Sequence, residues 1–246
     1  MLDPQHEDGA SGSAPHKATD CCRPSDPRIA SHFDQRMRDL AAAGEMPEMV
    51  DVSRGLLALL DDVAQERPTL LELGSGSGAL TVALLERGAA RADGVDLSSE
   101  SVATARRRAE QSGLGSRAEF RVGDGAQVQL EQHDWVVLDR VICCYPHVDQ
   151  LLSNSIGAAG RRYAFSVPHV RGWRGLANWL EFSAESLIDR LRRRPCPAYL
   201  HDIGMIERRL AVAGFRRLRQ KTVGRWYAAV FERTDSGRIA QSDSVS

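Results

Sequence analysis

A glycine-rich turn between a buried strand and a helix is the feature that most constrains how this chain folds. The residues before the turn, 70–73, are apolar apart from one carboxylate, which is typical of an interior parallel strand. Apolar side chains then recur at helical spacing over 80–84. Gly74, Gly76 and Gly78 stand at alternate positions between them, and a backbone without side chains can lie close to a ligand. The sequence therefore predicts a nucleoside-binding turn in an α/β sheet.

Two classes of nucleotide-binding protein have such a turn. Gly74, Gly76 and Ala79 also satisfy the dinucleotide fingerprint G-x-G-x-x-A, so an NAD(P)-dependent oxidoreductase of Rossmann type is one alternative. Glu72 argues against it, because a carboxylate at this strand end would crowd the anionic oxygens of a pyrophosphate. The same carboxylate suits a cationic ligand group. Asp96 ends a second strand and is placed to bind both ribose hydroxyls, which either class requires.

The ends of the next two strands favour one class. The third strand runs into Gly123, Asp124 and Gly125, and the fourth, 133–139, ends in Asp139. With the first turn and the ribose acid, these motifs resemble those of the class I S-adenosylmethionine-dependent methyltransferases over roughly residues 66–168. The resemblance implies S-adenosyl-L-methionine as cofactor. It also implies a cofactor site made of Glu72, Gly74, Ser75, Gly76, Gly78, Asp96, Leu97, Gly123, Asp124, Gly125 and Asp139.

The segment that follows the fourth strand, 139–147, is where the methyl acceptor is expected. It has no Asn-Pro-Pro-Tyr-like run, unlike the enzymes that methylate amino groups of nucleic acids. It is similar to the magnesium-protoporphyrin O-methyltransferase group, except that Cys144 stands where that group has a histidine. We therefore expect transfer to an oxygen of a small-molecule acceptor, with no nucleic acid partner. The alternative that Cys144 raises is a homologue that binds the cofactor without catalysis.

Two residues of this segment are candidates for catalysis. Tyr145 either hydrogen-bonds the acceptor or packs beside the pocket, as most half-buried tyrosines do. His147 either replaces the missing histidine as a base or is solvated on a loop. Neighbouring cysteines lack the spacing of structural zinc pairs, so no metal site is expected at Cys143 and Cys144. Cys21 and Cys22, with a nearby histidine, give no stronger indication.

Strand and helix patterns alternate along the core, which predicts a parallel sheet. The last two strands are linked through Gly224, and because this link is so short they must be antiparallel. The expected fold is therefore α/β, a Rossmann-like doubly wound seven-stranded sheet, mostly parallel with an antiparallel C-terminal hairpin. The later elements are expected as a helix from Ser98 or Ser99 to about Ser112, a strand over 163–167, a helix over 201–213 closed by Gly214, and strands over 215–222 and 226–233.

The two ends of the chain are polar and rich in small residues, so 1–28 and 234–246 are expected to be disordered tails. The methyltransferase domain would then span 29–233. A helical N-terminal cap is expected over 29–66. The segment 170–200 is longer than an ordinary connection, which indicates either a lid insertion or a helix packed on the sheet.

Bulk properties exclude several classes. A formal net charge of −1 and the lack of a strongly basic domain argue against nucleic acid binding. No apolar run reaches the roughly 20 residues that a membrane span needs, and the N-terminus lacks the pattern of a secretory signal. Five cysteines in this arrangement do not form a disulfide framework. We therefore expect a cytoplasmic protein, and the sequence leaves its oligomeric state open.

Overall fold

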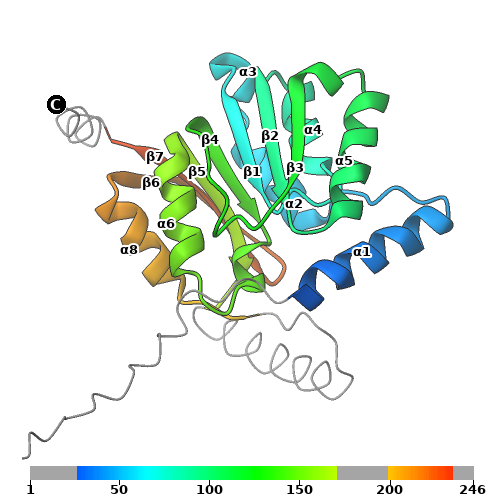
Figure 1. Cartoon of the computed structure of the whole chain (residues 1–246). Helices are drawn as coiled ribbons and strands as arrows, with labels where there is room; N and C mark the ends of the chain where they lie inside the picture. The colour runs from blue at the N-terminus through cyan, green and yellow to red at the C-terminus, as the bar shows by residue number, and fades with distance from the viewer. Residues whose placement is uncertain (1–26, 171–198, 235–246) are drawn as a thin grey trace, which may run out of the picture.

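The structure is a computed structural model that describes residues 27–170 and 199–234. Nearly all of both expected tails, and of the expected lid insertion, lies outside these ranges. Helix α1 already begins at Pro27, within the segment expected as a tail. The described part forms one sheet with helices on both faces (Figure 1). None of the described helices combines the length and apolarity that crossing a bilayer requires.

The sheet confirms the expected topology. Within the described ranges it has seven strands in the order β3-β2-β1-β4-β5-β7-β6. Strands β1 to β5 run parallel to one another, and β7 is antiparallel to both β5 and β6. The strands are β1 Thr69–Leu73, β2 Arg91–Asp96, β3 Ala118–Val122, β4 His133–Asp139, β5 Ala159–Pro168, β6 Phe215–Val223 and β7 Trp226–Arg233.

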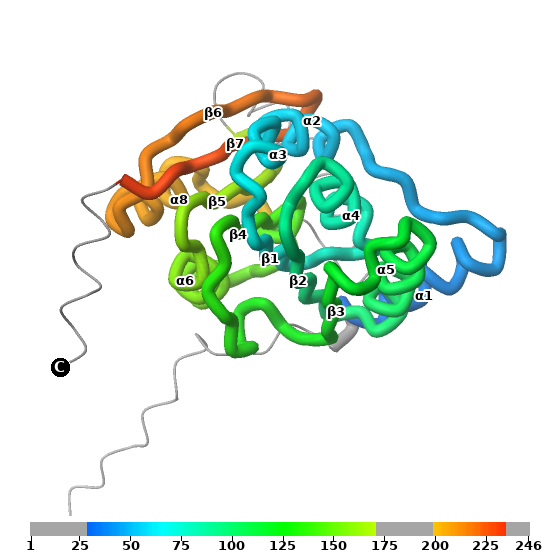
Figure 2. Tube along the Cα trace, turned by 90° about the horizontal axis from the view of Figure 1, so that it is seen from above, coloured from blue at the N-terminus to red at the C-terminus, as the bar shows by residue number. Residues whose placement is uncertain are grey.

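Helices cover both faces of this sheet. Helices α6 and α8 lie on one face, and α2, α3, α4 and α5 lie on the other (Figures 1 and 2). Helix α1 lies beside α5. The helices are α1 Pro27–Ala42, α2 Asp51–Leu59, α3 Val63–Glu66, α4 Ala79–Glu86, α5 Ser99–Gln111, α6 Asp149–Ala158 and α8 Ile203–Val212, and a 3₁₀ turn spans Ile142–Cys144.

Alternate residues of each central strand face opposite sides of the sheet, so each strand contributes to two hydrophobic cores. On β1, Leu70 packs into the cluster beneath α2 and α4, whereas Leu71 and Leu73 pack into the cluster beneath α6 and α8. On β4, Trp135 faces the first cluster and is fully buried. Both faces of the central strands are thus removed from water, which explains the nearly continuous apolar runs in the sequence.

Local signals fixed several boundaries. Ser98 is the N-cap of α5, and its hydroxyl accepts the Ser101 N–H at 3.0 Å. Gly214, with φ +82°, follows the end of α8. The expected start of α8 at His201 is corrected, because Asp202 caps the helix by accepting the Gly204 N–H.

Candidate functional site

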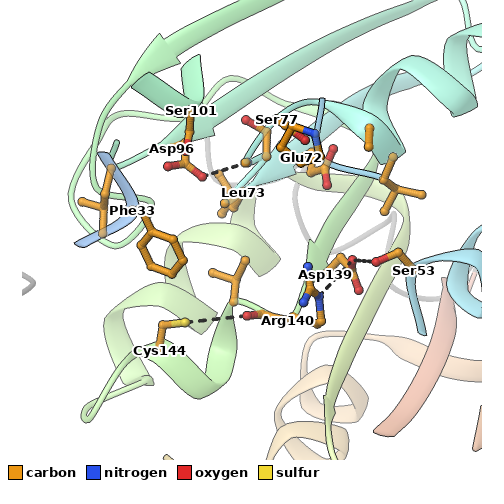
Figure 3. Close-up of a pocket in the computed structure, with 18 of the residues that line it drawn as sticks. Phe33, Ser53, Glu72, Leu73, Ser77, Asp96, Ser101, Asp139, Arg140 and Cys144 are labelled. Atoms are coloured by element: carbon orange, nitrogen blue, oxygen red, sulfur yellow. Dashed lines mark hydrogen bonds and ion pairs between the residues drawn. The ribbon is translucent and has the colours of Figure 1, made fainter. Parts of the chain in front are cut away.

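A cavity of about 490 Å³ opens at the carboxyl ends of β1, β2 and β4 (Figure 3). The strand order reverses between β1 and β4, and open α/β sheets bind ligands at such a reversal. The turn after β1, the ends of β2 and β4, and helices α1 and α2 all contribute to the wall. Its volume is within the range of small-ligand sites.

The three glycines of the turn have positive φ angles of +67°, +52° and +71° in chain order. A side chain at Gly74 would strike Val141 at 2.2 Å, whereas one at Gly76 would meet nothing within 4 Å. Gly76 therefore borders open space within the cavity wall. Gly78 is not among the residues that line the cavity. It lets α4 approach α5, because a Cβ there would lie 2.9 Å from the Cβ of Ala105.

These two glycines give a matched prediction. Gly78→Ala adds left-handed strain, which costs about 1–2 kcal/mol, and a clash with Ala105, so we expect the free energy of unfolding to fall by about 2–4 kcal/mol. Gly76→Ala adds the strain alone, and we expect a loss of about 1 kcal/mol together with a large loss of ligand affinity. Denaturant unfolding and calorimetric titration of both variants check this. Equal stability of the two variants would contradict the packing role of Gly78.

Asp96 ends β2 at the cavity wall. Its Oδ2 accepts the Gly76 N–H at 2.8 Å, and its Oδ1 accepts the Ser98 N–H at 2.9 Å. Burial raises the pKa of this carboxyl. A carboxylate offers about four acceptor positions, so two backbone bonds fix its orientation and leave positions for both hydroxyls of a ribose.

Glu72 lies on β1 and is 5% exposed. It accepts the hydroxyl of Thr81 from α4. Burial raises the pKa of Glu72 to about 8; the hydrogen bond from Thr81 opposes that shift, and the carboxylates of Asp139 and Asp96 add to it. A cationic ligand group in the cavity would favour the charged form.

Asp124 follows β3, and its two glycine neighbours line the cavity. Its Oδ1 accepts the hydroxyl of Tyr145 at 2.8 Å and the Ala126 N–H at 2.9 Å. Tyr145 lines the cavity and is 8% exposed. Burial raises the pKa of Tyr145, and its proton is already directed at Asp124. This geometry favours the packing alternative for Tyr145 over a catalytic one.

Asp139, at the end of β4, joins three elements. It accepts the hydroxyl of Ser53 from α2 and, at 2.5 Å, the hydroxyl of Ser166 from β5. The Nε atom of Arg140 lies 3.8 Å from its Oδ2. Arg140 has a φ of +58°, which is a strained backbone conformation for a residue other than glycine. Strained residues of this kind cluster at functional sites. Figure 3 shows Asp139 and Arg140 at the cavity with Ser53 beside them.

His147, the residue expected as a possible catalytic base, lies outside the cavity. His147 is exposed and is not among the cavity-lining residues, because it follows Tyr145 out onto the surface. Cys144 does line the cavity, and its Sγ lies 3.7 Å from the Arg140 carbonyl oxygen. Over the described ranges, no group of three or more His, Cys, Asp or Glu residues could hold a metal ion. Cys21 and Cys22 fall outside those ranges.

Sequence reasoning missed the part of the wall that α1 builds. Five residues of this helix line the cavity, namely Ile29, His32, Phe33, Arg36 and Met37. Residues 29–66 were expected to form a helical cap, but helical spacing does not reveal which side chains meet a site formed by distant strands. Ser53, on α2, was missed for the same reason, whereas Arg140 lies within the expected acceptor segment 139–147 but was not identified as a site residue.

The lining fits a cofactor with a nucleoside and cationic groups. Four acids, Glu48, Glu72, Asp96 and Asp139, line the cavity against two cations, Arg36 and Arg140. Ser75 also lines it, and its buried hydroxyl has no hydrogen-bond partner among the described residues. Phe33 and Leu97 supply apolar surface.

Comparison with known proteins agrees with this geometry. Residues 70–157 match the family described as methyltransferase domain. The ribosomal RNA small subunit methyltransferase A of Prochlorococcus marinus is 34% identical over 39% of this chain and 34% of its own length. The ribosomal protein L11 methyltransferase of Edwardsiella ictaluri is 27% identical over 56% of this chain and 43% of its own length. The chain thus matches less than half the length of either relative.

Among solved structures, the magnesium protoporphyrin IX methyltransferase of Synechocystis PCC 6803 with bound SAH has a TM-score of 0.65 at 21% identity. It covers 85% of this chain and 100% of that one. The family match over 70–157, the sheet order and the cavity at the strand reversal agree with the fold of the class I S-adenosylmethionine-dependent methyltransferases. A second structure of the Synechocystis enzyme, with a TM-score of 0.59 at 19% identity, holds bound SAM. Within the class, the fold of this chain is similar to that of the magnesium protoporphyrin enzyme.

One expectation about partners is wrong. The sequence predicted a small-molecule acceptor and no nucleic acid. The sequence relatives are instead named for ribosomal RNA and a ribosomal protein, and both of these are macromolecules. The expectation rested on the resemblance of the segment 139–147, and on a net charge that describes the whole chain and does not report what reaches the cavity.

Proposed function

We propose that this protein transfers a methyl group from S-adenosylmethionine to a macromolecular acceptor. The observation that carries the proposal is the convergence of Glu72, Asp96 and the Gly76 turn on one cavity at the strand reversal. S-adenosylmethionine supplies an electrophilic methyl group on a sulfonium. Holding donor and acceptor in line accounts for about 7–11 kcal/mol of rate acceleration in well-oriented systems, so the protein's main task is positioning.

We further propose that the acceptor atom is a carboxylate oxygen of a protein. The lining after β4 offers a guanidinium, Arg140, whose side chain is 43% exposed. A guanidinium orients a carboxylate by charge-assisted hydrogen bonds. A carboxylate is already a nucleophile and needs no base, which suits a segment where Cys144 stands in place of a histidine. The oxygen lone pair forms the C–O bond as the C–S bond breaks, and no proton moves.

The test uses S-adenosylmethionine labelled on its methyl group and an extract of the source cells. We expect label in a fraction that protease destroys and ribonuclease does not. Methyl esters hydrolyse in base, so mild alkali should release the label as volatile methanol. Ribonuclease-sensitive label would favour an RNA acceptor instead, and alkali-stable label in protein would favour nitrogen. Cofactor binding without labelling of any fraction would support the non-catalytic alternative.

Arg140 gives a variant test of the acceptor. We expect Arg140→Gln to lower kcat/KM for the acceptor about 10–100-fold, because a hydrogen bond to a charged group contributes about 1.5–3 kcal/mol. The Kd for S-adenosylhomocysteine should stay within twofold of the wild-type value. Arg140→Lys, which keeps the charge, should retain part of the activity. Equal activity of Arg140→Gln and the wild type would remove Arg140 from acceptor binding.

A further inference from the structure

Three hydrogen bonds that join helix α1 to the start of α5 converge on one carboxylate, that of Asp34. Asp34 Oδ1 accepts the Ser98 hydroxyl at 2.6 Å, the Glu100 N–H at 3.1 Å and the Ser99 hydroxyl at 3.5 Å. All three donors belong to the N-terminal turn of α5, where backbone N–H groups lack helical partners. Asp34 thus caps a helix of which it is not a part, and a carboxylate also interacts favourably with the helix dipole there.

The ionisation of Asp34 reflects these contacts. Burial acts to raise its pKa, but the hydrogen bonds from Ser98 and Glu100 and the charge of Arg38 outweigh burial and hold the pKa below its ordinary value. Helix α1 buries few apolar side chains. Within 29–42, Ile29 and Met37 are the buried apolar side chains. Arg38 and Glu100 form an ion pair at 3.4 Å, but both side chains are exposed, so this pair contributes little to stability.

Ser98 connects this contact to the proposed ribose site. Its hydroxyl donates to Asp34, and its backbone N–H donates to Asp96 at 2.9 Å. The same hydroxyl accepts the Ser101 N–H at 3.0 Å. Asp34, Ser98 and Asp96 therefore form a continuous hydrogen-bonded chain from α1 to the cavity wall.

The neighbours of Asp34 on α1 form another part of that wall. Phe33 precedes it directly, and His32, Arg36 and Met37 lie within one turn. Phe33 and Asp96 both line the cavity, and both are labelled in Figure 3. While Asp34 holds α1 against α5, these side chains form the wall of the cavity that Asp96 also lines.

We propose that Asp34 is a positioning residue for the cofactor: it fixes Asp96 through Ser98 and holds α1 as a wall of the cavity. The inference rests on the proposed function. Asp34 does not line the cavity itself, so it acts through residues that do. Loss of its carboxylate removes one of the hydrogen bonds that hold Ser98 and loosens α1 from α5, and both changes speed cofactor release.

The experiment measures the Kd and the dissociation rate of S-adenosylhomocysteine for three variants of the full chain. Asp34→Ala is expected to raise both about tenfold, with little change in the association rate. Asp34→Asn keeps an oxygen acceptor and should recover part of the loss. Asp39→Ala removes the same charge from an exposed site on the same helix and should match the wild type.

The outcomes separate this inference from the proposed function. Absence of binding to the wild-type protein would overturn the proposed function itself. Tight wild-type binding that Asp34→Ala leaves unchanged would overturn the role of Asp34 alone. A lower Tm with unchanged Kd and dissociation rate, measured well below the Tm of the variant, would show a purely structural cap. Faster hydrogen exchange of α1 amides in Asp34→Ala, reversed in Asp34→Asn, would support the inference.

Discussion

Asp96→Ala is expected to weaken the binding of S-adenosylhomocysteine by at least about 100-fold. The carboxylate is proposed to accept both ribose hydroxyls, and hydrogen bonds to charged groups contribute about 1.5–3 kcal/mol each. The variant also frees the N–H groups of Gly76 and Ser98, which Asp96 holds at 2.8 and 2.9 Å, so the turn loses its fixed shape. Isothermal titration calorimetry measures the effect directly.

Asp96→Asn is the matched variant for this prediction. It keeps the shape of the side chain, but one of its two terminal atoms becomes a donor that faces a backbone N–H group. We therefore expect affinity between that of the wild type and that of Asp96→Ala. Thermal unfolding of each variant controls for loss of structure. Folded variants that both bind within threefold of the wild type would remove Asp96 from the site.

Glu72→Gln is expected to stabilise the protein in alkaline solution. The folded-state pKa of Glu72 is raised to about 8 from its ordinary value near 4.5. Between these values the folded protein holds a proton that the unfolded chain releases, so the free energy of unfolding falls as pH rises through this window. Because one pKa unit corresponds to about 1.4 kcal/mol, the variant should be more stable by about 4 kcal/mol near pH 8.

Urea unfolding of the wild type and the variant between pH 5 and 9 measures this difference. Glu48→Gln is the control, because Glu48 lines the same cavity but is exposed, and it should leave the pH dependence unchanged. Parallel stability curves for the wild type and Glu72→Gln would contradict the raised pKa. Calorimetry near pH 7 should also detect proton release when S-adenosylmethionine binds the wild type, because its cationic groups favour the ionised carboxylate.

The parts of the site that sequence predicted are those that local chain geometry determines. Glu72, Asp96 and Asp139 each stand at or next to the end of a strand whose apolar pattern is unambiguous, and parallel strands bring such ends to one edge of the sheet. The glycine turn and the Ser98 cap depend on residue types within a few positions. The antiparallel hairpin followed from the short link at Gly224.

The parts that it missed depend on which distant segments pack together. The cavity wall formed by α1 requires Asp34 to meet α5, at a separation of more than sixty residues. Gly78 has the same spacing as its neighbours, yet it serves helix packing because Ala105 lies against it. Helix α6 was not expected, since its ten residues lie in a loop-like polar context. Its buried leucines are explained by the sheet beneath them.

The most direct measurement is the structure of the protein crystallised with S-adenosylhomocysteine. We expect the ligand in the cavity between β1 and β4, with both ribose hydroxyls within hydrogen-bonding distance of Asp96 and the adenine beside Gly123 and Gly125. A ligand bound anywhere else, or a ribose with no contact to Asp96, would contradict this expectation.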